Sequence, residues 1–223
     1  MKVLVVTCSP NEQGLTAACG EAARQGVVDA HSRARVVNLN SFRLDRCGVC
    51  DSGWGTCRTQ HQCCIEDDFA DLHGMFGEAE AYVLVTPVYF GEPSETWKAL
   101  FDRLRRCEAT KPAESPGVFA GKPTIAIAAA GGSGGGAVHC LGEIERLLQQ
   151  LGAQPLDFIP VTQRTREYQL ETIHDALVTL CTSSPAAPRE AEGEAHKGRR
   201  APRSSFSKRR RGGGEGRGGA RAG

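Results

Sequence analysis

Up to residue 161, the chain contains short apolar runs, and each has the length and the β-branched or small residues of a strand buried on both faces. Segments of mixed polarity separate these runs. The runs are KVLVVT at 2–7, ARVVNL at 34–39, AYVLVT at 81–86, KPTIAIAAA at 122–130 and PLDFIPV at 155–161. The pattern therefore predicts five buried strands.

The segments between the runs show helical spacing. In 94–104, one face at i, i+3, i+4 and i+7 is made by Trp97, Leu100, Phe101 and Leu104. Further helices are predicted at 15–30, 67–79, 138–151 and 168–180. Strands that alternate with helices form a parallel sheet with helices on both faces, because the crossovers are right-handed. The chain is therefore predicted to fold as an α/β domain.

Three loops are candidate binding sites, because ligands of such sheets lie beyond the carboxyl ends of the strands, near the point where strand order reverses. They follow the first, third and fourth predicted strands. Their sequences are CSPNEQGLT at 8–16, PVYFGEPS at 87–94 and GGSGGGA at 131–137.

The first loop suits an anion although it has no Lys or Arg. Ser9 and Thr16 offer hydroxyls, Asn11 offers an amide, and Gly14 lets the backbone approach a ligand closely. The following helix start adds unpaired N–H donors, which can hold a single phosphate. No P-loop motif is present. An ordinary capped helix start is the alternative.

The second loop is apolar. Pro87, Val88, Tyr89 and Phe90 stand at the end of the third strand. Pro87 keeps Thr86 extended, and we expect the chain to leave the strand there. Such a run suits a flat apolar ring system. A dimer patch or a buried loop is the alternative, and a planar cofactor at an interface would combine the two.

The third loop has five glycines in residues 131–136, which permit positive φ angles and close approach by a ligand. It also contains Gly132-x-Gly134-x-x-Ala137, a formal match to the dinucleotide fingerprint. The fingerprint would follow the fourth strand rather than the first, and Asp157 lies too early in its strand to bind a ribose. A dinucleotide-binding enzyme stays an alternative.

The three loops, in this order, resemble the flavodoxin-like NADPH-dependent FMN reductase family, which includes the iron–sulfur flavoproteins. The resemblance covers about residues 2–180. It is carried by Ser9-Pro10 with Gly14 and Thr16, by TPVYFGEPSETWKALFDR at 86–103, by GKPTIAIAAAGGSGGGA at 121–137, and by CGVC and CCIEDDF between them.

The resemblance implies a three-layer flavodoxin-like fold that binds FMN on a five-stranded parallel sheet of order 2-1-3-4-5. It also implies which residues bind each part of the cofactor. By position, the phosphate would be held by Ser9, Asn11, Gly14, Leu15 and Thr16. The isoalloxazine ring would be flanked by Pro87, Val88, Tyr89 and Phe90, with Gly131 and Gly132 approaching from the other loop. Asn11 stands where the family often has Arg.

Ten cysteines are many for such a chain, and half of them lie within eighteen residues: Cys47, Cys50, Cys57, Cys63 and Cys64. Clustered thiols suggest metal binding or redox work, and the first four are candidate ligands of an iron–sulfur cluster or zinc, with Cys64 as a spare. Six residues separate Cys50 from Cys57, whereas the iron–sulfur flavoproteins have two there. Without metal, the segment would be a thiol-rich loop packed over the flavin or a partner subunit.

Charge divides the chain in two. Residues 183–223 hold eleven basic and four acidic residues, or +7, and since the whole chain is +1, residues 1–182 carry −6. We expect 1–182 to be the FMN-binding domain and 183–223 a disordered Arg/Gly-rich tail. The tail resembles segments that contact RNA, and a solvated extension is the alternative. We expect nucleic acid to play no other part.

No apolar run is long enough to span a membrane, and Met1-Lys2 leads directly into the first strand pattern without a signal peptide, so we expect a cytoplasmic protein. The resemblance implies a homodimer or larger, using NAD(P)H as co-substrate and a quinone, free flavin or other electron carrier as acceptor. The alternatives are an electron-transfer flavoprotein without NAD(P)H turnover, and a flavin-free binding module. No catalytic side chain is expected, and the six His are interpreted as surface or packing residues.

Overall fold

A computed structural model describes residues 1–112 and 114–183. The strands are β1 (Lys2–Thr7), β2 (Arg33–Asn38), β3 (Ala81–Tyr89), β4 (Glu92–Pro93), β5 (Pro123–Ala130) and β6 (Gln154–Thr162). The helices are α1 (Leu15–Asp29), a 3₁₀ turn η1 (Leu39–Ser41), α2 (Cys50–Gly53), α3 (Thr56–Thr59), α4 (Phe69–Glu78), α5 (Glu95–Glu108), α6 (Ala137–Gln150) and α7 (Arg166–Thr182). Apart from Ser183, the predicted tail lies outside the described residues, so the domain boundary stays a prediction.

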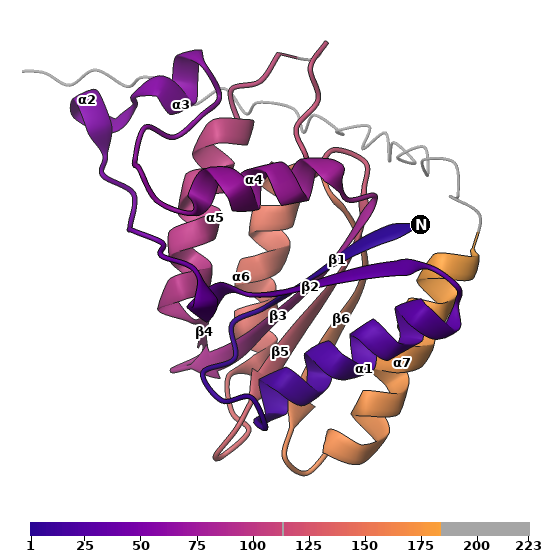
Figure 1. The fold of residues 1–223 in the computed structure, drawn as a ribbon. Coiled ribbons are helices and arrows are strands. Elements are labelled where there is room, and N and C mark those ends of the chain that lie inside the picture. The colour runs from indigo at the N-terminus through magenta and orange to yellow at the C-terminus, as the bar shows by residue number, and fades with distance from the viewer. Residues whose placement is uncertain (113, 184–223) are drawn as a thin grey trace, which may run out of the picture. The chain divides into compact units, whose positions relative to one another are not determined.

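The sheet confirms the predicted α/β fold. Its order is β2-β1-β3-β5-β6, with all neighbours on this path parallel, and the strand order reverses beside β1 (Figure 1). The sheet has six strands rather than the five predicted. The extra strand is β4, which pairs antiparallel with the end of β3, so the predicted order 2-1-3-4-5 becomes 2-1-3-5-6. A strand of two residues is too short to leave a hydrophobic pattern in the sequence.

Helices cover both faces of the sheet, and two cores result. β1 alternates between them, since Leu4 and Val6 point to one core and Val3 and Val5 to the other. The first core lies under α4, α5 and α6 and includes stacked Trp97 and Phe101, whose ring centroids are 4.0 Å apart. The second lies under α1 and α7 (Figure 1).

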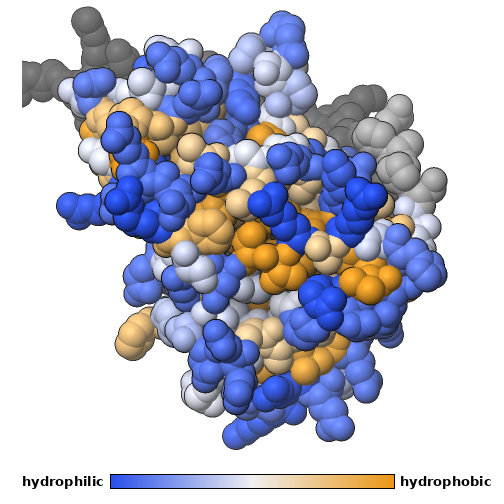
Figure 2. All heavy atoms as spheres, viewed as in Figure 1, coloured by the Kyte–Doolittle hydropathy of each residue, from blue (hydrophilic) through white to orange (hydrophobic). Residues whose placement is uncertain are grey.

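The edge strand β2 is the most exposed part of the sheet, and within it only Val37 is buried. Figure 2 shows the consequence on this face, where polar side chains cover the outer surfaces of the helices and apolar surface appears toward the middle. Among the described helices, none has the length and hydropathy needed to cross a membrane.

Candidate functional site

A cavity of about 850 Å³ opens at the carboxyl ends of β1, β3 and β5. The three loops singled out in the sequence supply most of its lining. All eleven predicted cofactor-binding residues line it: Ser9, Asn11, Gly14, Leu15, Thr16, Pro87, Val88, Tyr89, Phe90, Gly131 and Gly132. The topology thus brings together residues that lie more than a hundred positions apart in the sequence.

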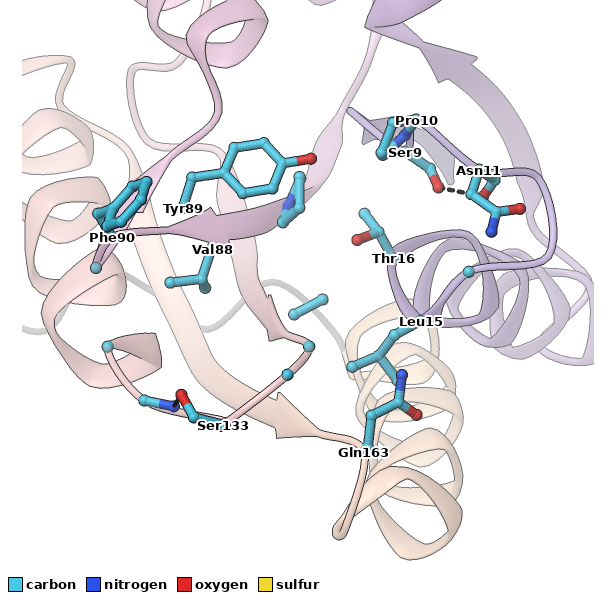
Figure 3. Close-up of a pocket in the computed structure, with 18 of the residues that line it drawn as sticks. Ser9, Pro10, Asn11, Leu15, Thr16, Val88, Tyr89, Phe90, Ser133 and Gln163 are labelled. Atoms are coloured by element: carbon cyan, nitrogen blue, oxygen red, sulfur yellow. Dashed lines mark hydrogen bonds between the residues drawn. The ribbon is translucent and has the colours of Figure 1, made fainter.

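The first loop is fixed by its own polar groups. The Ser9 hydroxyl donates to the Asn11 carbonyl at 2.5 Å, and the Asn11 side chain accepts from the Gln13 N–H at 2.9 Å (Figure 3). From the β2 side, the Asn38 and Asn40 amides donate to the backbone carbonyls of Ser9 and Cys8. These hydrogen bonds fix the shape of the loop, and they do not occupy the N–H groups at the start of the helix that follows it.

The N-terminus of α1 faces the cavity as an uncapped helix end. Its N-cap is Gly14, no side chain caps the first turn, and that turn has no acidic residue. Gly20 lets the helix lie close to the sheet, because a Cβ there would come within 2.6 Å of the Thr7 side chain. Free N–H groups and the helix dipole at this position attract an anion.

The second loop is a β-hairpin. β3 runs on through Pro87 to Tyr89, so the expectation that the chain leaves the strand at Thr86 was wrong. Pro87 fixes a φ that an extended strand accepts, and it stays paired with β5. Phe90 and Gly91 form the two-residue turn, both with positive φ, as a type I′ turn requires.

The two aromatic residues of the hairpin differ in exposure. Tyr89 is 40% exposed, and its ring extends from β3 toward the first loop (Figure 3). Phe90 is fully exposed at the outer rim. Thr86 is buried and accepts a hydrogen bond from the Ser94 N–H at 3.1 Å, which ties the hairpin to the start of α5. The apolar wall is thus anchored at its base and open at its tip.

The third loop makes a glycine contact that no other residue would allow. Gly136 has φ +83°, and a Cβ there would lie 2.6 Å from the Cα of Gly91 in the hairpin. This close approach closes one side of the cavity. Around Gly131 and Gly132, by contrast, no described atom would lie within 4 Å of an added Cβ, so their backbone is open to a ligand.

Sequence reasoning missed several lining residues. They are Pro10, Gly91, Ala129, Ser133, Gly135, Gly136, His139 and Gln163. His139, interpreted as a surface or packing residue, is largely exposed but belongs to the cavity rim, near the start of α6. Gln163 follows β6, so the carboxyl end of the fifth parallel strand was a usable signal. The described lining contains no Lys or Arg, and His139 is its one ionisable group apart from Tyr89.

The cysteine segment, residues 46–66, lies away from this cavity, whose described lining includes no cysteine. Its two ends are held by Arg103 of α5, which is almost fully buried. Arg103 donates to both carboxylate oxygens of Asp67 at 2.5 and 2.8 Å and to the Asp45 carbonyl at 3.0 Å. Its guanidinium also stacks over Phe69 at 4.2 Å.

The ion pair at the base of the cysteine segment is stable despite its burial. Burial alone would raise the pKa of Asp67, but the hydrogen bonds from Arg103 and from two backbone N–H groups lower it below its usual range. Burial would likewise lower the pKa of Arg103, whereas Asp67 and the nearby Cys63 thiol raise it. Both groups therefore stay charged at neutral pH.

The predicted ligand set Cys47, Cys50, Cys57 and Cys63 lines one small cavity, and a metal site there stays a prediction. In residues 1–112 and 114–183, no group of three or more His, Cys, Asp or Glu is arranged to hold a metal ion. Cys57 and Cys63 pack against the core, whereas Cys50 lies 3.7 Å from Cys64, sulfur to sulfur. The long spacer after Cys50 contains α2, where Asp51 and Ser52 adopt left-handed backbone angles.

One alternative from the sequence was a thiol-rich loop packed over the flavin. In the structure, the thiol-rich segment does not cover the cavity. It packs instead on α5. Thr110 is within 3.5 Å of the Cys57 and Arg58 carbonyls, and Arg106 donates to the Gly53 carbonyl and stacks on Trp54.

Comparisons with known proteins agree with this fold. The family model for NADPH-dependent FMN reductase matches residues 1–158. An iron–sulfur flavoprotein of Methanocaldococcus jannaschii is 30% identical over 105 residues, covering 47% of this chain and 52% of that protein. The chain thus spans about half the length of the curated relatives it matches first.

Two solved structures share the fold at low sequence identity. An NAD(P)H:quinone oxidoreductase from Methanothermobacter marburgensis aligns with a TM-score of 0.61 and 18% identity, covering 81% of this chain and 96% of that one. A flavodoxin from the domain Archaea aligns with a TM-score of 0.54 and 16% identity over the same shares. The fold is therefore flavodoxin-like, and the chain belongs to the NADPH-dependent FMN reductase family.

Proposed function

We propose that this protein is an FMN-dependent oxidoreductase that takes reducing equivalents from NAD(P)H and passes them to a quinone, a free flavin or another electron carrier. The observation that supports this most is the convergence of three loops on one cavity of about 850 Å³, with an uncapped helix N-terminus among its walls. That volume falls in the range of roughly 300–1,000 Å³ common for ligand pockets.

The two parts of FMN match the two kinds of cavity wall. The first-turn N–H groups of α1 and the Thr16 hydroxyl would hold the phosphate, with Ser9 and Asn11 shaping the loop around it. Because the lining has no Lys or Arg, the helix dipole and hydrogen bonds would balance the phosphate charge. Asn11, where the family often has Arg, fits this uncharged design.

The apolar wall would receive the ring system of the cofactor. Val88 and Tyr89 would lie against the ring, and the open backbone of Gly131 and Gly132 would approach its polar edge. Bound FMN supplies the hydride and electron transfer chemistry itself, so the chain's contribution is placement and polarity. This explains why no catalytic side chain was expected.

The rim is the side from which a co-substrate would enter. Phe90 and His139 are both exposed there. A quinone is the first acceptor to test, because a solved structure of the same fold is a quinone oxidoreductase. A homo-oligomer, NAD(P)H as co-substrate and a cytoplasmic location stay predictions from the sequence.

Anaerobic reduction tests the proposal. The protein is loaded with FMN, freed of excess, and mixed with NADPH or NADH while the visible flavin absorption is followed. We expect one of the two to bleach it and an added quinone to restore the colour. If only dithionite bleaches it, the protein is an electron-transfer flavoprotein without NAD(P)H turnover. Failure to retain FMN at all would overturn the proposal.

A further inference from the structure

Two of the ten cysteines stand apart from the rest. The sulfurs of Cys50 and Cys64 are 3.7 Å apart, in contact with each other, and Cys64 is exposed while Cys50 is half-buried. Four others are buried, and burial raises their pKa to about 12: Cys8, Cys19, Cys107 and Cys140. A dissolved reagent therefore reaches the Cys50–Cys64 pair but not these four thiols.

The surroundings of Cys50 and Cys64 do not fit the iron–sulfur cluster that the names of the relatives imply. Five cysteines line a cavity of about 20 Å³ together with Arg103 and Arg106. A space of this size holds about one water molecule, far less than a cluster of several iron and sulfide ions. Nor does the described part of the chain arrange three or more His, Cys, Asp or Glu so that they could hold a metal ion. The two sulfurs face each other instead.

The backbone around Cys50 is irregular and can shift when the two sulfurs approach each other. Val49, Asp51 and Ser52 all have positive φ, and α2 is a four-residue turn rather than a regular helix. Non-glycine residues in this region are strained, and such strain tends to gather at functional sites. A disulfide needs the sulfurs to close from 3.7 Å to about 2.05 Å, and this irregular turn is the element that would absorb the shift.

We propose that Cys50 and Cys64 form a reversible dithiol–disulfide site whose substrate is a low-molecular-weight disulfide. The Cys64 sulfur, as the more exposed, attacks the disulfide RSSR, forming a mixed disulfide and releasing one RSH. Cys50 then attacks the Cys64 sulfur, forming the Cys50–Cys64 bond and releasing the second RSH. Both cysteines are oxidised, RSSR is reduced, and the two thiol protons leave on the two RSH molecules.

The difference in exposure supports this order of attack, because Cys64 is exposed and Cys50 is half-buried. Arg103 and Arg106 line the same small cavity as the two thiols. The site lies outside the FMN cavity, so the proposal does not depend on flavin chemistry.

Mass spectrometry tests the site directly. The reduced, FMN-loaded protein is equilibrated with glutathione and its disulfide at graded ratios, quenched with acid, alkylated and digested. We expect a linked pair of peptides joined through Cys50 and Cys64 that grows as the disulfide fraction rises. Cys64→Ser should abolish the link, whereas Cys50→Ser should leave glutathione attached to Cys64.

Matched variants keep the test sharp. Cys63→Ser changes the neighbouring residue, and Cys181→Ser changes a half-buried thiol on α7. Both should keep the link, and all variants should keep FMN. The proposal is overturned if no link forms at any ratio, if other cysteine pairs link as readily, or if the thiols resist glutathione disulfide while the protein holds iron or zinc.

Discussion

The proposed FMN cavity and the cysteine segment are built in opposite ways. The cavity is formed by backbone at the ends of regular strands, with glycines, hydroxyls and a helix N-terminus and without Lys or Arg. The cysteine segment is a long connection that contains only short helical turns, and a buried ion pair between Arg103 and Asp67 holds its base. Topology determines the first region, and individual side chains determine the second.

Because the two regions are built differently, we expect a substitution in one region to leave the properties of the other unchanged. A change at the base of the cysteine segment should cost stability and leave FMN affinity intact. A change in the loops should cost FMN affinity and leave the thiols as they are. Variants at Arg103, Gly136 and Thr16 test this separation, and a variant at Glu108 tests a buried charge on α5, in order from the largest expected effect to the smallest.

Arg103→Met should destabilise the fold by about 3–5 kcal/mol, because it leaves the Asp67 carboxylate buried without its ion-pair partner. Urea unfolding of the FMN-free protein measures the loss. Arg105→Met removes an exposed pair with Asp102 on the same helix and should change stability by less than about 1 kcal/mol. If Arg103→Met weakened FMN binding under folding conditions as strongly as it lowered stability, the two regions would not be separable.

Glu108, on the same helix as Arg103, gives a pH test. Burial alone would raise its pKa, but hydrogen bonds from His73, Lys111 and the Val118 N–H lower the pKa from 4.5 to about 2. Since the folded pKa lies below the unfolded one, the stabilisation is complete above pH 4.5 and is lost as pH falls toward 2.

Glu108→Gln should remove this pH dependence. The difference in unfolding free energy between wild type and variant should shrink by up to about 3 kcal/mol as the solution is acidified through that window. Chemical unfolding at several pH values measures it. An unchanged difference would mean that the carboxylate gains nothing from its partners.

Gly136→Ala should act on the other region. Its positive φ and the close Gly91 backbone predict a loss of about 1–3 kcal/mol and a weaker FMN complex. Gly142→Ala lies on the same helix with nothing within 4 Å of the new Cβ, and it should stabilise by about 0.5–1 kcal/mol. Equal FMN affinity in both variants would show that the loop contact does not shape the cavity.

Thr16→Asp should weaken FMN binding at least about tenfold, equivalent to about 1.4 kcal/mol, because it sets a negative charge beside the phosphate. Because Thr16 is buried, the new carboxylate loses hydration, which opposes the favourable effect of an acid in the first turn of a helix, so urea unfolding of the FMN-free variant is measured alongside. Thr172→Asp, an exposed change on α7, is the control. Quenching of flavin fluorescence measures both, and matching affinities would place the phosphate elsewhere.

The sequence was informative where regular structure repeats. Continuous apolar runs located the five parallel strands to within a few residues, and the carboxyl ends of three of them led to the cavity. It failed where local contacts decide. β4 is two residues long, His139 lies at the rim beside Gly91 of the hairpin, and Gln163 follows a strand whose carboxyl end was not searched.

The cysteine segment was the hardest to predict for the same physical reason. Thiol spacing along the chain suggested a four-ligand set, which stays a prediction, and it gave no sign that Cys50 lies against Cys64, the residue set aside as a spare. Spacing in the sequence measures distance between thiols only where the backbone between them is regular.

A crystal structure of the protein grown with FMN tests the central claim most directly. We predict the phosphate at the first turn of α1, beside Thr16, and the ring against Tyr89, with no flavin contact from residues 46–66. FMN bound outside this cavity, or no FMN in crystals grown at saturating concentration, would contradict the account.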